Sequence, residues 1–142
     1  MRVVFVCLGN ICRSPAAEGV MRQLAPDITL DSAGTGGWHV GDAPYGPMQA
    51  AARARGIDLS GLRARQFTSL DFDNFDLIIA MDRQNEADIA RLRPAGNETP
   101  VQLMADQDVP DPYYTRDFDA ALDIIEEAAT LMLARISLMR DR

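Results

Sequence analysis

The chain alternates between short apolar runs and longer stretches with helical periodicity. The apolar runs are four to six residues long and are bounded by turn-forming residues, which is typical of strands buried in a sheet. The predicted strands cover residues 3–6, 28–33, 77–81 and 101–104, with a further short one at 65–67. Apolar side chains three and four positions apart predict the helices. These cover residues 14–24, 47–55, 83–92 and 117–138, with a helical turn at 69–75.

Strands that alternate with helices predict an α/β fold. We expect a single-domain, open parallel sheet of about four strands with helices on both faces. In such sheets, ligands bind beyond the carboxyl ends of the strands. Polar residues follow every main strand at that edge, namely Cys7, Ser32, Asp82 and the segment 105–114. The sequence therefore predicts one site at which these four segments meet.

Composition limits the classes of function. A chain of 142 residues, 47% hydrophobic and 25% charged, fits one domain spanning residues 1–142. The net charge of −7 argues against nucleic acid or an anionic membrane as a partner. The apolar runs are too short to span a bilayer, and the N-terminus enters a strand directly, so we expect a cytoplasmic protein. Two cysteines in one loop make neither a disulfide framework nor a zinc site, and we expect no metal.

The strongest chemical signal lies where the first strand ends. Residues 7–13, here called the anion-binding loop, connect that strand to the N-terminus of the first helix. Backbone N–H groups and the helix dipole at such a turn attract a tetrahedral anion. The same field favours the thiolate of Cys7, which makes it a nucleophile. Arg13 offers a planar fork for two oxygens of the anion, and Ser14 can donate to the sulfur.

The Cys-x5-Arg-Ser pattern after a strand resembles the phosphate loop of protein tyrosine phosphatases. The wording CLGNICRSP, close to the N-terminus of a chain of this size, resembles the low-molecular-weight branch of that family. DSAGT with a following Trp, then Arg65-Gln66, Met81-Asp82 and DPYY, occur in the family's order over nearly the whole chain. The resemblance implies a strand order of 2-1-3-4, a protein phosphotyrosine substrate, inorganic phosphate as product, no cofactor, and a monomer or weak dimer.

The general acid is expected in the segment after the last strand. Expelling an alkoxide or phenoxide at neutral pH needs a proton donor, and Asp106, Asp108 and Asp111 are candidates. Prolines flank Asp111 and stiffen its backbone, and the resemblance assigns the acid to this residue of DPYY. An ordinary Asp-Pro turn is the alternative. The resemblance also implies that Tyr113 and Tyr114 contact substrate.

Other residues receive supporting roles. The resemblance implies that Trp38 walls the cleft, with a core position as the alternative. It also implies that the hydroxyl of Ser32 holds Asn10 in a strained conformation and that Asp82 supports the site. The remaining loop residues expected to bind the anion are Leu8, Gly9, Asn10, Ile11 and Cys12. Cys12 is either a partner of Cys7 in a reversible protective disulfide, as in the family, or a small core residue.

Two positions depart from the family's pattern, and one residue is left without a role. Residues 45–48 stand where relatives usually carry Asp-Pro-Arg, which leaves the path of that loop open. Leu62 replaces a histidine that in some relatives pairs with the aspartate at position 82. His39, the single histidine, has no partner for a hydrolase triad or a metal site, and we expect a surface residue without a role.

The expected reaction is hydrolysis of phosphotyrosine and small aryl phosphates through a cysteinyl-phosphate intermediate. Protein-arginine phosphatase is an alternative, although its members typically carry threonine at the position of Ile11. Thiol-linked arsenate reduction is less favoured, because the chain has no cysteine after Cys12 to relay oxidation. A non-catalytic phosphate-binding module is less favoured too, since Cys7, Arg13 and Asp111 are all present.

Overall fold

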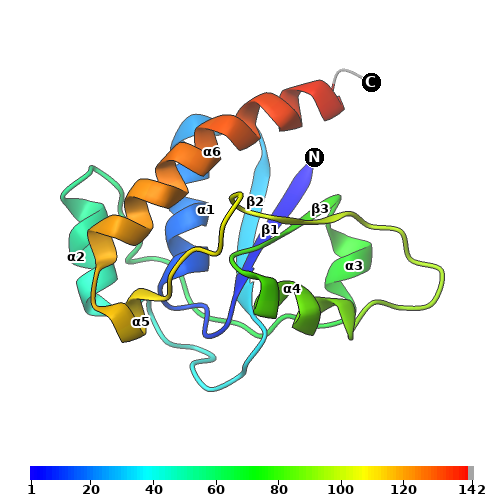
Figure 1. The fold of residues 1–142 in the computed structure, drawn as a ribbon, viewed down its shortest axis with the longest axis horizontal. Helices are drawn as coiled ribbons and strands as arrows, with labels where there is room; N and C mark the ends of the chain where they lie inside the picture. The colour runs from blue at the N-terminus through cyan, green and yellow to red at the C-terminus, as the bar shows by residue number, and fades with distance from the viewer. Residues whose placement is uncertain (141–142) are drawn as a thin grey trace.

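The computed structural model describes residues 1–140 and contains one four-stranded parallel sheet (Figure 1). The strands are β1 (Arg2–Cys7), β2 (Thr29–Gly34), β3 (Leu77–Ala80) and β4 (Val101–Leu103). Their order across the sheet is β2-β1-β3-β4, which confirms the expected α/β class and strand order. The last two residues of the expected domain 1–142 lie outside the described residues.

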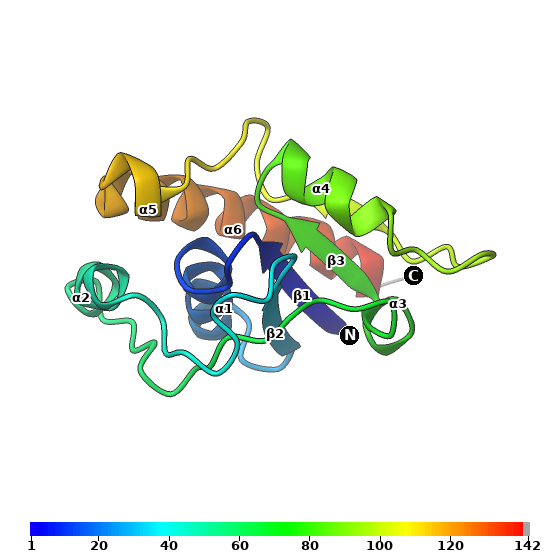
Figure 2. The same ribbon diagram turned by 90° about the horizontal axis from the view of Figure 1, so that it is seen from below.

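Helices cover both faces of the sheet, as expected. They are α1 (Arg13–Leu24), α2 (Gly46–Arg53), α3 (Asp71–Asn74), α4 (Arg83–Ala90), α5 (Pro112–Thr115) and α6 (Phe118–Arg140). Helices α1 and α6 pack together on one face, and α3 and α4 contribute to the core on the other (Figures 1 and 2). The helix α2 lies beside α6, at the same end of the molecule as α5.

Strand β1 lies inside the sheet and is buried on both faces, which explains its continuous apolar run. Val3, Phe5 and Cys7 belong to the core beneath α1 and α6, whereas Val4 and Val6 belong to the core beneath α3 and α4. Because side chains alternate along a strand, this register directs Cys7 toward the α1 face at the carboxyl end of the sheet. The nucleophile candidate is therefore placed by the packing of the whole strand.

Several boundaries differ from the sequence prediction. Residues 65–67 form only a single bridge, between Gln66 and Gly34, and no full strand. The segment before α6 was expected to be a loop but contains the single-turn helix α5. Its signals were present in the sequence, because Asp111 caps the helix and Pro112 occupies its first turn. Within residues 1–140, no helix is long and apolar enough to cross a membrane.

Candidate active site

The anion-binding loop joins β1 to α1 and surrounds the sulfur of Cys7. The backbone N–H of Asn10 donates to Cys7 Sγ at 3.2 Å, and Ser14 Oγ lies 3.0 Å from the same sulfur. In this contact either Ser14 Oγ or Cys7 Sγ can be the donor. A hydroxyl that donates to sulfur stabilises the thiolate. Cys7, Asn10 and Ser14 are all buried, so the sulfur is held from two sides with little contact with bulk water.

Asn10 adopts a left-handed backbone conformation, with φ of 58°. Asparagine tolerates this region better than most residues. Its side chain is held at both ends: Nδ2 donates to Ser14 Oγ at 2.8 Å, and Oδ1 accepts from the backbone N–H of Arg65 at 3.0 Å. The loop also packs closely on the end of β2, where a Cβ on Gly34 would lie 2.7 Å from the carbonyl oxygen of Leu8. The strained turn is thus fixed by contacts from three segments.

The expected contact between Ser32 and Asn10 is wrong. Ser32 Oγ instead donates to Glu18 Oε1 at 2.8 Å, beneath α1. The register of the sheet explains the difference, since Ser32 pairs with Phe5, two residues before Cys7, and so lies below the loop. Glu18 is buried, and burial raises the pKa of its carboxyl group, although Ser32 and Arg22 oppose the shift.

Arg13 connects the loop to the opposite wall of the site. Its Nη1 donates to Asp82 Oδ2 at 2.6 Å and to the carbonyl oxygen of Val109 at 2.9 Å, and its Nη2 lies 3.4 Å from Asp111 Oδ2. Burial disfavours its charge, but the negative charge of Cys7, the hydrogen bond to Asp82 and the charge of Asp111 outweigh it and raise the pKa of Arg13. The guanidinium therefore stays cationic and oriented between nucleophile and carboxylate.

Asp82 performs two structural tasks at once. It is the N-cap of α4, where its Oδ1 accepts from the backbone N–H of Asn85 at 2.7 Å, while Oδ2 accepts from Arg13. The capping role was expected from the sequence. Leu62, at the position of the family's histidine, is partly buried and packs on the core. The support that Asp82 gives to the site thus goes directly to Arg13.

Cys7 and Asp111 line the same cleft, which has a volume of about 270 Å³. Asp111 is the N-cap of α5, and its Oδ1 accepts from the backbone N–H of Tyr113 at 3.0 Å. Its other oxygen faces Arg13. The remaining expected residues that line the cleft are Leu8, Gly9, Ile11, Cys12, Arg13, Trp38, Tyr113 and Tyr114. Asn10 and Ser14 do not line the cleft. Both contact the sulfur of Cys7, and they are hydrogen-bonded to each other.

The outer wall of the cleft is an aromatic rim formed by Trp38, Tyr113 and Tyr114. Trp38 is 74% exposed and Tyr114 is 72% exposed, so the alternative of a core position for Trp38 does not hold. The rings of Tyr113 and Tyr114 meet edge to face, with centroids 5.4 Å apart. Exposed rings around a narrow cleft suit a flat aromatic group that enters between them.

His39 also lines the cleft, which the sequence analysis missed. Its ring centroid lies 6.4 Å from that of Tyr113, and its Nδ1 lies 3.2 Å from Asp42 Oδ2. Its side chain packs near Gly9, where an added Cβ would approach the imidazole to 3.1 Å. The available signal was its position directly after Trp38 in a glycine-rich loop.

Cys12 lies directly before α1 and lines the same cleft as Cys7. Both cysteines are free and buried. Burial, followed by the negative charge of Cys7, raises the pKa of the Cys12 thiol to about 12. Cys12 is therefore a neutral thiol at physiological pH and cannot replace Cys7 as the nucleophile.

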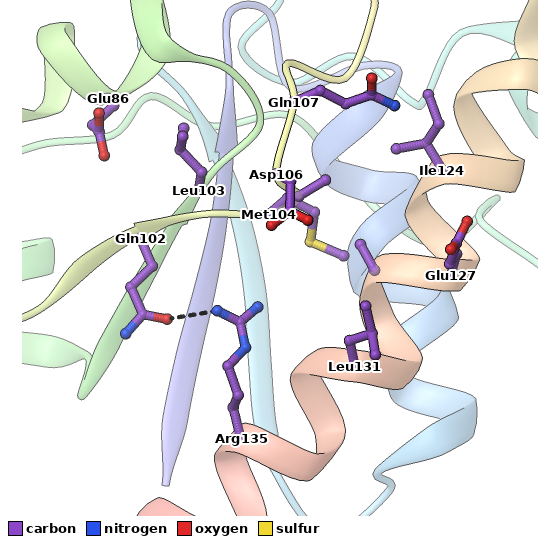
Figure 3. A pocket seen from close by; sticks show the side chains of 12 residues that line it. Glu86, Gln102, Leu103, Met104, Asp106, Gln107, Ile124, Glu127, Leu131 and Arg135 are labelled. Atoms are coloured by element: carbon purple, nitrogen blue, oxygen red, sulfur yellow. Dashed lines mark hydrogen bonds between the residues drawn. The ribbon is translucent and has the colours of Figure 1, made fainter.

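A second hollow of about 820 Å³ lies between β4, α4 and α6 (Figure 3). Glu86, Asp106 and Glu127 surround it, and Arg135 reaches across it toward Gln102 Oε1, at 3.5 Å. Asp106, one of the three candidates for the general acid, lines this hollow and not the cleft, and none of the other expected site residues lines it. Among residues 1–140, no group of three or more His, Cys, Asp or Glu side chains is arranged to hold a metal ion.

A thiol, a guanidinium and a carboxyl group around one small cleft form the arrangement that nucleophilic phosphoryl transfer requires. The model of the family described as low molecular weight phosphotyrosine protein phosphatase matches residues 2–141. The chain belongs to this family.

Individual relatives agree with this assignment. The chain is 42% identical to the low molecular weight protein-tyrosine-phosphatase YfkJ of Bacillus subtilis, with 94% of each chain covered. The crystal structure of YfkJ superimposes with a TM-score of 0.92 at 40% identity, covering 98% of this chain and 96% of that one. The structure of DARP, the drosophila arginine phosphatase, superimposes with a TM-score of 0.90 at 30% identity, covering 96% and 98%.

Proposed function

We propose that this protein hydrolyses phosphotyrosine in proteins, and small aryl phosphates, through a cysteinyl-phosphate intermediate and without a metal ion. The observation that carries the proposal is the meeting of Cys7, Arg13 and Asp111 at one cleft, although about a hundred residues separate the nucleophile from the acid. Membership of the family supports the same reaction.

In the first step, the thiolate of Cys7 attacks phosphorus in line with the bond to the tyrosyl oxygen. The backbone N–H groups of the anion-binding loop and the guanidinium of Arg13 hold the three equatorial oxygens. Asp111, in its protonated form, gives its proton to the departing tyrosyl oxygen. Because Arg13 and the loop supply the countercharge, the step needs no metal ion.

In the second step, water hydrolyses the cysteinyl phosphate. Asp111 is now a carboxylate and accepts a proton from the water that attacks phosphorus. Inorganic phosphate leaves the loop and the thiolate of Cys7 is restored. Ser14, 3.0 Å from the sulfur, stabilises the thiolate both as it leaves and before the next attack.

Phosphoarginine is the second candidate substrate, because a structural relative is an arginine phosphatase. One feature favours the aryl ester. Ile11 lines the cleft with an apolar side chain, from which a phenyl ring gains more than a guanidinium does. The aromatic rim can stack on either group.

The further properties that we propose follow from this activity. The whole chain, residues 1–142, acts as one catalytic domain on phosphotyrosine-containing proteins in the cytoplasm, as a monomer or weak dimer.

We also propose that Cys12 protects the nucleophile. Peroxide oxidises Cys7 to the sulfenic acid and is itself reduced to water; condensation of the sulfenic acid with the Cys12 thiol then releases a second water and leaves a disulfide that thiols reduce. Peroxide inactivation should then be reversible in the wild type and irreversible in Cys12→Ser.

The decisive experiment is an assay with p-nitrophenyl phosphate in the presence of a chelator. Wild-type protein should be active, Cys7→Ser should lose activity by about 10⁴-fold or more, and Asp111→Asn by about 10²-fold or more. Leu131→Ala, an exposed change on α6 in the second hollow, is the matched control and should retain full activity. Activity that survives loss of Cys7, or that the chelator removes, contradicts the mechanism. Phosphotyrosine and phosphoarginine peptides then separate the two substrates.

A further inference from the structure

Tyr45 lies between the anion-binding loop and α5, the helix that carries Asp111. Its backbone N–H donates to the carbonyl oxygen of Ile11 in the loop at 2.8 Å. Its ring packs on Tyr113 of α5, with centroids 5.2 Å apart and an interplanar angle of 52°. One partly buried residue therefore contacts both halves of the proposed chemistry.

The far end of α5 is also held by Tyr45. Arg116, the C-cap of α5, has a left-handed backbone with φ of 65°. Its Nη1 donates to the Tyr45 hydroxyl at 3.0 Å, and its guanidinium lies over the Tyr45 ring, 5.3 Å from the centroid. The same guanidinium lies 5.4 Å from the ring centroid of Phe118, at the start of α6. A strained backbone of this kind persists only where its surroundings hold it.

Helix α5 needs such contacts, because it has only four residues and a single helical turn is not stable by itself. At its N-terminal end, the contact of Asp111 with Arg13 is long, at 3.4 Å, and the Asp111 side chain is 22% exposed. Further along α5, Tyr113 packs on the ring of Tyr45, and Arg116 donates to its hydroxyl. The orientation of the acid thus depends on a residue of a different segment.

We propose that Tyr45 is a positioning residue for the general acid: it fixes α5 against the anion-binding loop, so that the carboxyl group of Asp111 faces the leaving oxygen. This inference rests on the proposed phosphatase mechanism. Tyr45 begins the segment 45–48, at which the chain departs from the family's pattern.

A displaced acid has a specific kinetic signature. Leaving groups of high basicity, such as the phenol of phenyl phosphate, depend on proton donation, whereas the weakly basic dinitrophenol leaves almost without it. Tyr45→Ala should therefore lower kcat/KM for phenyl phosphate by about 10- to 100-fold, and for 2,4-dinitrophenyl phosphate by at most about 3-fold. Inorganic phosphate should inhibit the variant as it inhibits the wild type, since the backbone bond from residue 45 to Ile11 remains.

Two further variants separate positioning from a general loss of stability. Tyr45→Phe keeps the ring and removes only the bond from Arg116, so its change should be smaller but should show the same dependence on the leaving group. Tyr45→Leu keeps apolar bulk and replaces Tyr45→Ala if the latter does not fold. Leu131→Ala is the control, with unchanged kinetics for both esters. An equal loss for both leaving groups, or no loss, overturns the proposal.

Amide hydrogen exchange of residues 113–116 provides a readout that does not depend on activity. In Tyr45→Ala these amides should exchange at least about 10-fold faster than in the wild type, while the amides of β1 should be unchanged. If the wild type hydrolyses neither ester, the proposed function fails, and the exchange of residues 113–116 still decides whether Tyr45 holds α5. Unchanged exchange in a folded variant overturns the proposal.

Discussion

The anion-binding loop and the aromatic rim are the two sides of one cleft, yet they are built in opposite ways. Asn10, Arg13 and Ser14 are buried and hydrogen-bonded to one another, to the sulfur or to distant segments. Trp38 and Tyr114 are mostly exposed. The loop therefore has one arrangement, while the rim can adjust to what enters.

This difference separates chemistry from recognition. A phosphoryl group has the same shape in every substrate, so the groups that bind it gain from being fixed in advance. The protein that carries the phosphate varies, so the outer contacts gain from exposed rings with few constraints. Changes in the loop should lower the rate of the chemical step, whereas changes at Trp38 and Tyr114, the two most exposed residues of the rim, should alter substrate binding alone.

After the loss of the nucleophile itself, the largest expected effect is at Arg13. Arg13→Lys keeps the positive charge but loses the fork that reaches Asp82, Val109 and the bound anion. We expect kcat/KM for p-nitrophenyl phosphate to fall by about 10²- to 10³-fold. The matched control is Arg83→Lys, since Arg83 is exposed at the start of α4 and should change kcat/KM by less than about 2-fold. A fall as small as that of the control would contradict this prediction, because a positive charge at position 13 would then be enough for catalysis without the guanidinium fork.

The next effect concerns the strained turn at Asn10. Asn10→Gly tolerates the φ of 58° but loses the side-chain bonds to Ser14 and Arg65, whereas Asn10→Ala also strains the backbone. Both should lower kcat/KM by about 10-fold through the freed hydroxyl of Ser14. The alanine variant should be less stable, with a free energy of unfolding about 1 kcal/mol below that of the glycine variant. Equal stability of the two would mean that the turn relaxes.

A smaller effect is expected at the rim. Trp38→Ala removes an exposed ring, so the free energy of unfolding should change by less than about 0.5 kcal/mol. KM for a phosphotyrosine peptide should rise by about 5-fold, which corresponds to one lost aromatic contact, while inhibition by inorganic phosphate should not change. A fall in kcat with unchanged KM would contradict this, because Trp38 would then contribute to the chemical step and not to substrate binding.

The smallest effect is at Glu18, behind the loop. Burial raises the pKa of its carboxyl group above the ordinary value of 4.5, so the folded protein holds this proton more tightly than the unfolded chain. The stability of the wild type relative to Glu18→Gln, which cannot ionise, should therefore fall as the pH rises from 4.5 through the raised pKa. The difference in the free energy of unfolding between the two proteins should therefore shift in favour of the variant between pH 4 and pH 7. Denaturant unfolding at pH 4 and pH 7 measures this, and a difference independent of pH contradicts it.

The parts of the site that lie within one segment were predictable. Cys7, Arg13 and Ser14 follow from a strand, a loop and a helix start that are consecutive in the chain. Asp111 was distinguished from Asp106 and Asp108 by its prolines, and it is the one that lines the cleft. His39 was missed because its one local signal, the position directly after Trp38, does not show whether its side chain reaches the cleft.

Contacts between distant segments were not predictable in the same way. Ser32 stands in the right strand, but the register with Phe5 places its hydroxyl beneath α1, on Glu18. The proposed role of Tyr45 depends on its lying beside Tyr113 and Arg116, and these residues are close because α6 packs on α1 and α2.

The amino-acid sequence by itself predicted the order of the four strands and the longer helices, the proposed nucleophile with its loop, and the segment that holds the proposed acid, because hydrophobic periodicity and turn chemistry act over neighbouring residues. The tertiary structure alone decided which groups hold the loop and orient the acid. The physical reason is that hydrogen bonds and ring contacts require distances of a few ångströms, and a one-residue shift in register or a different rotamer replaces one partner by another.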